Sequence, residues 1–191
     1  MSKFGTAIID PPWPYEKSSR HERLTGYSDK EYRHLGIDDL QSLKINGLAD
    51  YVFLWTTGPF IESAYKLLRD WGLEPITFLG WVKTAEIIQG NEPAFKPNYG
   101  VGYWFRGCIE PIILAKKPGV PSIRTNFVGI LSPNSRHSRK PHTLHEVVET
   151  CFPGPYLEIF ARELRLGWRC LGNEAPWGGD DIRVSLERLH L

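Results

Sequence analysis

The stretch FGTAIIDPPW, residues 4–13, decides the fold. Residues 4–9 are apolar or β-branched, a pattern typical of a buried strand. Pro11 and Pro12 lack the backbone N–H that a strand would use, so the strand is expected to end there and a loop to begin. The sequence therefore predicts a buried strand that carries Asp10 at its carboxyl end.

The tetrapeptide Asp10-Pro11-Pro12-Trp13 combines three groups that suit one kind of ligand. The Asp10 carboxylate and the Pro11 carbonyl can accept the two N–H hydrogens of an amino group on a flat heterocycle, and an exposed Trp13 can stack on the ring. Binding of this kind leaves the amine lone pair free to attack an electrophilic methyl group. The alternative is a strand end followed by a Pro-Pro turn and an exposed tryptophan, with no catalytic role.

Apolar runs and helical spacing alternate along the rest of the chain. Strands are expected at 50–57, 75–83, 108–115, 156–161 and 167–172. Helices are expected at 60–71, ending at Gly72, at 143–152, where Thr143 and Glu146 have capping-box spacing, and over the last dozen residues. This alternation favours an α/β fold with a parallel sheet, in one domain spanning residues 1–191.

Two segments without periodicity interrupt this pattern. Residues 14–34 and residues 84–107, the second rich in Gly, Asn, Pro and aromatic residues, are expected to be loops. Long loops on a rigid scaffold often carry binding residues, so both are predicted to contact substrate.

The composition places the chain among ordinary globular proteins. It has 191 residues, a formal net charge of +1, 41% apolar residues and 24% charged residues, which excludes global disorder. The apolar run before Asp10 is too short for a signal peptide or a membrane span. Cys108, Cys151 and Cys170 form no CxxC pair and are interpreted as reduced, buried thiols. Together these features predict a cytoplasmic protein without a membrane segment.

The positive charge is concentrated in one part of the chain. From Pro111 to His145 there is no Asp or Glu, while the rest of the chain carries 17 basic and 22 acidic residues. The basic residues of this stretch are Lys116, Lys117, Arg124, Arg136, Arg139 and Lys140. One interpretation is a solvated loop face; the other is a local surface that follows nucleic-acid phosphates.

Further motifs follow Asp10–Trp13 in a defined order. They are Phe53-Leu54-Trp55, Trp71-Gly72, Trp81-Val82-Lys83, Gly102-Tyr103-Trp104 with Glu110, Ser138-Arg139-Lys140-Pro141, Leu157 to Arg162, Gly167-Trp168 and Gly172-Asn173-Glu174. With these motifs the chain, from Phe4 to about Pro176, resembles the N6-adenine methyltransferases related to the seventy-kilodalton catalytic subunit of the messenger-RNA adenosine methyltransferase.

The resemblance implies a Rossmann-like methyltransferase fold in the circularly permuted motif order, with S-adenosylmethionine (SAM) as cofactor. It implies that Asp10 receives the target amino group and lies beside the methionine part of SAM. Pro11 would supply the carbonyl acceptor, Pro12 completes the catalytic motif, and Trp13 would flank a flipped adenine. Metal dependence is not expected, because transfer from a sulfonium needs alignment rather than a Lewis acid.

The resemblance also assigns residues outside this motif. For the cofactor, Lys140 matches the lysine that binds the SAM carboxylate, Phe160 and Arg162 match residues around the ribose and adenosine, and Asn173 and Glu174 match the pair that closes on SAM. The residues expected to contact the substrate are Tyr27, Trp81, Lys83, Trp104, Glu110, Arg136 and Arg139.

Two departures from the family pattern limit what can be carried over. The family usually has a segment about twenty residues before its DPPW motif that contacts the SAM adenine, whereas here only nine residues precede Asp10. Near Leu164 and Arg165 the loop differs in length from that of the messenger-RNA enzyme, so no ribose contact is assigned there. His142 and His145, at i and i+3, are interpreted as structural because the second histidine of a zinc protease motif is missing.

The substrate remains open at this level. The expected activity is methyl transfer to the N6 amino group of adenine in nucleic acid, with DNA favoured over RNA because the chain is short and resembles in size a bacterial or phage modification enzyme. The alternatives are the same chemistry on RNA adenosine, and a catalytically inactive homologue that binds nucleic acid as a scaffold. A homodimer is one way for so small an enzyme to read a site.

Overall fold

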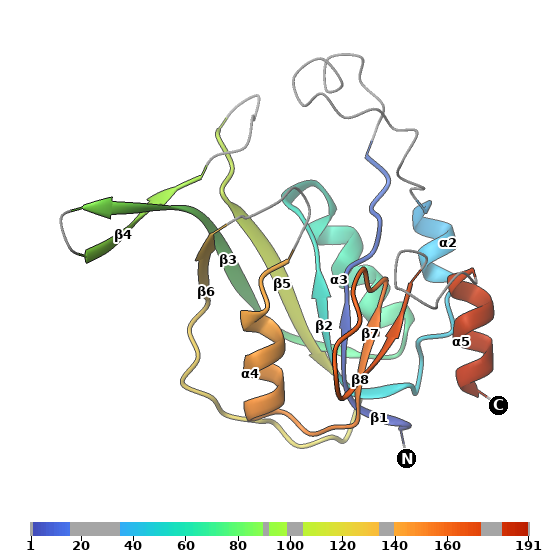
Figure 1. The fold of residues 1–191 in the computed structure, drawn as a ribbon. Helices are drawn as coiled ribbons and strands as arrows, with labels where there is room; N and C mark the ends of the chain where they lie inside the picture. Colours follow the sequence, from blue (N-terminus) through green and yellow to red (C-terminus); the bar gives the residue numbers. More distant parts are fainter. Residues whose placement is uncertain are drawn as a thin grey trace.

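The strand that carries Asp10 lies inside a mixed sheet, flanked on both sides (Figure 1). The computed structural model describes residues 2–15, 35–89, 92–98, 105–133, 140–172 and 181–190. Within them eight strands pair in the order β4-β3-β5-β2-β1-β7-β8, and β6 pairs with β3. The strands are β1 (Phe4–Ile9), β2 (Ala49–Trp55), β3 (Glu74–Gln89), β4 (Glu92–Pro97), β5 (Ile109–Lys116), β6 (Ile130–Pro133), β7 (Tyr156–Ile159) and β8 (Trp168–Leu171).

Four described α-helices and one 3₁₀ turn accompany this sheet. They are α2 (Ile37–Gln41), the 3₁₀ turn η1 (Gly58–Phe60), α3 (Ile61–Asp70), α4 (Thr143–Cys151) and α5 (Ile182–His190). The expected helices at 60–71 and 143–152 and the C-terminal helix are therefore confirmed, and Gly72 follows α3 with a φ of 74°. The prediction of a capping box at Thr143 was wrong. The N-cap of α4 is His142, and the His142 side chain makes no capping hydrogen bond.

The prediction of a parallel sheet is correct for one half only. β2, β1, β7 and β8 are parallel neighbours, but β5 runs antiparallel to both β2 and β3, and β4 runs antiparallel to β3. Apolar periodicity predicts that a segment is a strand but carries no information on its direction, which depends on the connections. The reversal of β5 brings Glu110, near its start, to the edge of the sheet where β1 and β2 end.

The two sheet faces are buried by different helices, as Figure 1 shows with α4 in front of the sheet and α3 behind it. Ala7 and Ile9 of β1 belong to the apolar cluster that includes Leu67 of α3 and Leu186 of α5. Ile8 belongs to the other cluster, which includes Leu144 and Val148 of α4. The alternation of β1 residues between two cores explains why the whole segment is apolar.

The predicted loop at 84–107 was wrong in its first part. β3 continues to Gln89 and pairs with β4 through a register that runs from Thr84 and Pro97 to Gln89 and Glu92. Gly, Pro and Asn residues in this segment suggested a loop, but antiparallel pairing supplies hydrogen bonds that a local pattern does not reveal. Residues 16–34, most of the other predicted loop, lie outside the described residues.

Other expectations are partly met. Trp55, Trp71 and Trp168 are buried, as predicted for core residues. The three cysteines are free, as predicted, but only half buried, so the expectation of buried thiols was wrong. Across the described ranges, no helix combines the length and the apolar character needed to cross a membrane.

Candidate active site

Asp10 follows β1 and Phe160 follows β7, and the chain leaves these two neighbouring strands in opposite directions. Ile9 of β1 pairs with Ile159 of β7, and the Asp10 N–H donates to the Ile159 carbonyl at 3.3 Å. From β1 the chain proceeds to β2 on one side, while β7 proceeds to β8 on the other. In open α/β sheets, ligands bind outside the carboxyl ends of the strands at such a switch point. Asp10 therefore follows β1 at the place where this fold class binds ligands.

Asp10 is the first of four alternating charges at this edge of the sheet. Lys140 Nζ lies 3.1 Å from Asp10 Oδ1 and 3.2 Å from Glu110 Oε2, and Glu110 Oε1 forms an ion pair with Lys83 Nζ. The side chains of Asp10 and Lys140 are each 20% exposed, so ligand atoms can still reach them. Lys140 Nζ also lies 5.1 Å from the centre of the Trp55 ring, a cation–π contact. We call Asp10, Lys140, Glu110 and Lys83 the charged quartet.

Burial and charge act in opposite directions on the members of the charged quartet. Burial raises the pKa of Asp10 above its ordinary value, and the attraction of Lys140 only partly opposes this. Burial also acts to raise the pKa of Glu110, but Lys140 and Lys83 outweigh it and lower the pKa. For Lys140, burial acts to lower the pKa, whereas Asp10 and Glu110 together raise it. Lys140 is therefore held as a cation, while Asp10 accepts a proton more readily than an exposed aspartate.

Trp13 does not lie where the sequence suggested. Only 4% of its surface is exposed, its ring stacks on Phe60 with centroids 5.3 Å apart, and its indole N–H donates to the Trp55 carbonyl at 3.1 Å. The expectation that Trp13 is exposed was wrong for this structure, because Phe60 of η1 packs on the ring and the ring is buried. The predicted contact of Trp13 with adenine stays a prediction. The backbone N–H of Trp13 donates to the Pro11 carbonyl at 2.9 Å, which leaves one lone pair of that oxygen for another donor.

Tyr15 is the aromatic residue of this segment that is exposed. It is 45% exposed, packs at a right angle on Phe60 with centroids 5.0 Å apart, and its hydroxyl contacts the Thr57 hydroxyl. Burial raises the pKa of the Tyr15 phenol, and the charges of Asp10, Glu110 and Lys140 also act on it. Sequence analysis missed Tyr15 and Thr57. The signal available was their position, just after two strands that end at the same sheet edge.

Trp81 and Lys83 belong to the same strand but differ in exposure. Trp81 is 1% exposed, and its indole N–H donates to the Ser132 carbonyl at 3.2 Å, so its side chain lies in the core. Its predicted contact with substrate stays a prediction. Lys83 Nζ lies 5.1 Å from the centre of the Trp81 ring. Trp81 therefore supports Lys83 from the core side.

The segments after β7 and β8 lie unusually close together. Phe160 has a φ of 66°, in the left-handed region that a bulky residue rarely adopts. A Cβ on Gly172 would lie 2.2 Å from the Ala161 carbonyl oxygen, so only glycine permits this approach. The positive charge of Arg162 acts to lower the pKa of Asp10, although burial keeps that pKa raised. Phe160, Arg162 and the end of β8 thus converge on the side of the site opposite Glu110.

This donor set fits the amino-acid part of SAM. A partly exposed carboxylate, Asp10, stands next to a partly exposed ammonium, Lys140, and together they complement a zwitterion that carries a further positive charge. The remaining sequence-predicted residues cannot be placed. Tyr27, Trp104, Arg136, Arg139, Asn173 and Glu174 lie outside the described residues.

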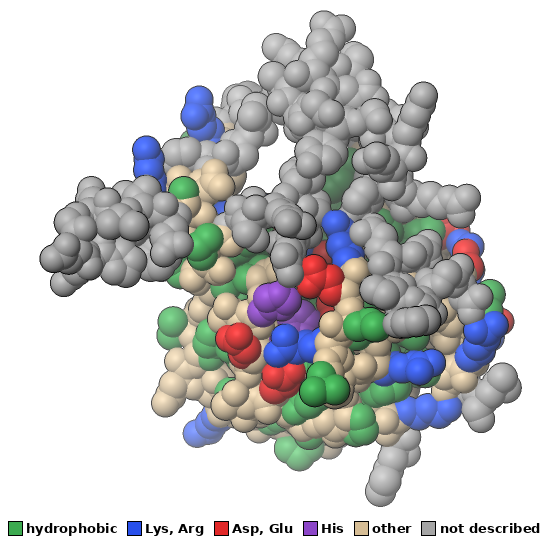
Figure 2. Space-filling model, in the orientation of Figure 1, with side chains coloured by type: hydrophobic (Ala, Val, Ile, Leu, Met, Phe, Trp, Pro, Cys, Tyr) green, Lys and Arg blue, Asp and Glu red, His purple; other side chains and the backbone are tan. Residues whose placement is uncertain are grey.

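The basic stretch does not form one face among the residues that the structure describes. Lys116 pairs with Tyr51, near the start of β2, whereas Lys140 contacts Asp10 beyond the end of β1, so the two lysines lie at opposite edges of the sheet. Lys116 donates to the Val120 carbonyl at 2.7 Å and pairs with Glu74. On the surface seen in Figure 2, Lys and Arg side chains stand in several separate places among acidic ones. The expected local basic face was therefore wrong for Lys116 and Lys140.

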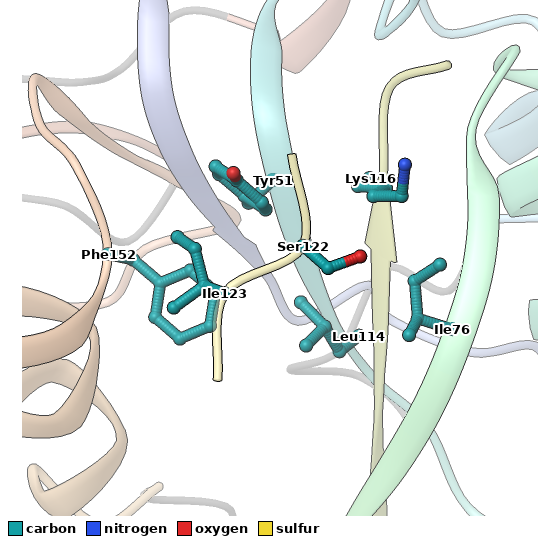
Figure 3. A pocket seen from close by; sticks show the side chains of 7 residues that line it. All are labelled: Tyr51, Ile76, Leu114, Lys116, Ser122, Ile123 and Phe152. Atoms are coloured by element: carbon teal, nitrogen blue, oxygen red, sulfur yellow. The ribbon is translucent and has the colours of Figure 1, made fainter. Parts of the chain in front are cut away.

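A small pocket and a histidine–glutamate pair lie near this sheet but outside the charged quartet. A small, mostly apolar pocket lies at the edge opposite Asp10, where Tyr51, Leu114 and Phe152 line it (Figure 3). On α4, His145 Nε2 lies 3.1 Å from Glu158 Oε2 and its ring packs against Trp168. Within the described ranges, no group of three or more His, Cys, Asp or Glu side chains is placed to hold a metal ion.

The sheet order and the charged site together define a doubly wound α/β protein whose charged quartet lies at the switch point of the sheet, the place where this fold class binds ligands. A family model described as MT-A70 matches residues 4–174, and the chain belongs to this family. The resemblance in sequence is thereby confirmed, and the sheet is that of a Rossmann-like methyltransferase fold.

Three relatives show how far the similarity extends. The chain is 29% identical to "N(6)-adenosine-methyltransferase MT-A70-like" of Arabidopsis thaliana over 91% of its own length and 24% of the relative's. It is 27% identical to the human "N(6)-adenosine-methyltransferase catalytic subunit METTL3" over 91% of its length and 28% of METTL3. It is also 27% identical to "Type II methyltransferase M.MunI" of Mycoplasma, over 91% of its length and 78% of M.MunI. The chain thus spans about a quarter of the adenosine methyltransferases that it matches.

Proposed function

We propose that residues 1–191 act as a single methyltransferase domain that transfers a methyl group from SAM to the N6 amino group of adenine in nucleic acid. The observation that carries the proposal is the partly exposed Asp10, placed at the switch point and paired with Lys140 at 3.1 Å. Membership of the MT-A70 family supports the same chemistry.

Each part of the site has a task in this reaction. SAM, when bound, supplies an electrophilic methyl group. Lys140 neutralises the SAM carboxylate, and Phe160 and Arg162 face the adenosine part. The Asp10 carboxylate and the free lone pair of the Pro11 carbonyl accept the two N–H hydrogens of the target amine and orient its nitrogen lone pair.

Asp10 also provides a place for the proton that the methylated amine must lose. Burial raises the pKa of this carboxyl, so protonation of its Oδ atoms is easier than for an aspartate in water. Glu110 keeps Lys140 charged and in place, and Lys83 pairs with the other oxygen of Glu110.

We favour DNA over RNA as the substrate. The alignment covers 78% of the type II methyltransferase M.MunI and 28% of human METTL3, so the matched domain makes up most of M.MunI, and this supports the preference. A homodimer and a cytoplasmic location remain parts of this proposal, and mass measurement in solution tests the first.

The decisive experiment measures methyl transfer from tritiated SAM to DNA and RNA oligonucleotides. The wild-type protein is expected to label DNA, and Asp10→Asn to lower the rate by about a hundredfold or more, because the amine loses an anionic acceptor. Asp70→Asn is the matched control, since Asp70 pairs with Lys66 on the surface of α3. Sequencing of DNA from an expressing host then identifies the modified adenine.

The second candidate is an inactive scaffold that binds nucleic acid. Asp10 and Lys140 are both present and paired, which argues against it. Calorimetric titration with SAM separates the two: absence of SAM binding, together with equal behaviour of wild type and Asp10→Asn, would replace the enzyme with the scaffold.

A further inference from the structure

The Trp13 side chain is buried in the protein interior. One face of its ring stacks on Phe60 with an interplanar angle of 12°, and its indole N–H donates to the Trp55 carbonyl. Only 4% of its surface is exposed. A base could stack on Trp13 only after these contacts had been broken. The aromatic residue of the catalytic motif therefore acts here as a support for its neighbours.

Tyr15 has the properties that Trp13 lacks. Its ring is held by an edge contact with Phe60 at 84° and by the contact between its hydroxyl and that of Thr57, yet it remains 45% exposed. Two contacts at different atoms fix the plane of the ring, so little side-chain entropy remains to be lost when a flat ligand binds. An exposed aromatic ring that is already oriented is well suited to stacking.

The place of Tyr15 is set by two strands that end together. β1 ends just before Asp10, and its pairing of Ile9 with Leu54 brings the end of β2 to the same edge. Thr57 comes two residues after Trp55, whose ring lies under Lys140. The Tyr15–Thr57 contact therefore holds the exposed ring at the same sheet edge as the Asp10–Lys140 pair, near enough for the charges of both residues to act on the Tyr15 phenol.

We propose that Tyr15 supplies the aromatic surface on which the target base stacks, while Trp13 and Phe60 support Tyr15 from the core. This inference rests on the proposed function and names a substrate-contact residue within it. The hydroxyl of Tyr15 positions the ring through Thr57, and the ring itself contacts the base. Stacking of a base on an aromatic side chain corresponds to a change in affinity of about fivefold to a hundredfold.

The test uses the full chain and a duplex that contains 2-aminopurine at the adenine position found by sequencing. Tyr15→Leu removes the ring, Tyr15→Phe keeps it, and Phe78→Leu is the matched control, because Phe78 is a 59% exposed aromatic residue of β3 outside the site. For each protein we measure the fluorescence of this probe, the kcat/KM for methyl transfer to the same duplex with adenine at that position, and the SAM affinity.

We expect Tyr15→Leu to lower kcat/KM and probe affinity by about fivefold to a hundredfold, with SAM affinity within twofold of wild type. Tyr15→Phe and Phe78→Leu should stay within threefold. The inference fails if Tyr15→Leu matches wild type, if Tyr15→Phe loses as much as Tyr15→Leu, or if SAM affinity falls in parallel with kcat/KM. If the wild-type protein itself neither binds SAM nor methylates DNA or RNA, the proposed function fails first, and this inference fails with it.

Discussion

Glu110 holds two lysines at once, and this makes it the residue on which the geometry of the site depends. It forms ion pairs with Lys140 and with Lys83, and its side chain is 15% exposed. Removal of one partner from a buried ion pair is usually more costly than replacement of the whole pair, because a charge is left without compensation. Lys140 retains Asp10 in such a variant, whereas Lys83 would lose its only carboxylate among the ion pairs of the described residues.

We predict that Glu110→Gln lowers the free energy of unfolding by about 1–3 kcal/mol. Adding Lys83→Met should recover part of this loss, because the second lysine is then removed as well. Urea unfolding of the two single variants and the double variant measures the coupling. Strict additivity of the two changes would contradict the ion pair as the cause.

The same variant also bears on the pH dependence of activity. The negative charge of Glu110 helps to raise the pKa of Asp10, so its removal should lower that pKa. The acidic limb of the kcat/KM profile should then move to lower pH, because Asp10 stays ionised further into acid. A limb that does not move would indicate that another group controls it.

At the scale of elements, α4 is joined to the loop before β8 by Glu149. Arg165 donates to both carboxylate oxygens at 2.7 and 2.9 Å, and the Trp168 indole N–H donates to Oε1 at 2.6 Å. The hydrogen bonds from Arg165 lower the pKa of Glu149 from 4.5 to about 2, with burial opposing them and Trp168 assisting. Because α4 begins three residues after Lys140, this contact also holds the helix that follows the site.

The pH dependence of this contact can be stated with its sign. The folded-state pKa of Glu149 is below the unfolded one, so its contribution is present above pH 4.5 and is lost as the pH falls toward 2. We predict that Glu149→Gln destabilises the protein by about 1 kcal/mol at pH 7, a small value because solvent reaches the side chain and screens it. Denaturant midpoints of wild type and variant, measured from pH 7 down to pH 2.5, should converge in acid. A constant gap would show that the charge of Glu149 is not responsible.

At the scale of the whole molecule, the site is assembled from segments that are far apart along the chain. Asp10 follows β1, Glu110 belongs to β5, Lys140 precedes α4 and Phe160 follows β7. A ligand that bridges these segments binds the folded chain and not the unfolded one, so it must raise the midpoint of thermal unfolding.

We predict that SAM at a hundred times its Kd stabilises the fold by about 2.7 kcal/mol. For a chain of this size, that corresponds to a rise in Tm of roughly 5–11 °C. Lys140→Met should lose most of the rise with SAM but keep a smaller rise with adenosine, which has no carboxylate. Scanning calorimetry measures both shifts, and an equal rise with SAM in wild type and Lys140→Met would contradict the carboxylate contact.

The elements that could be predicted are those whose own side chains face a core. β1 and α4 follow from apolar spacing alone, because each buries its residues whatever its neighbours are. β6 and α2 were missed, since each has few buried residues of its own and depends on pairing or packing with others. The β3–β4 pairing was missed for the same reason, as its stability comes from cross-strand hydrogen bonds.

The site was predicted less completely than the fold. The importance of Asp10 and Lys140 followed from the motifs, but their contact with Glu110 depends on the direction of β5, which no local pattern encodes. The exposure of Trp13 was predicted wrongly, because a tryptophan after Pro-Pro is equally compatible with a buried ring until Phe60 is placed beside it.

The sequence by itself determined the positions of the core strands, the Asp-Pro-Pro-Trp motif at the end of β1 and the family to which the chain belongs. These are properties of local apolar spacing and of residues adjacent in the chain. Only the tertiary structure decided that Lys140 lies between Asp10 and Glu110, that Trp13 is buried and that Tyr15 is exposed beside them. The physical reason is that burial, ion pairing and pKa depend on distances in space between segments, and strand direction and packing set those distances.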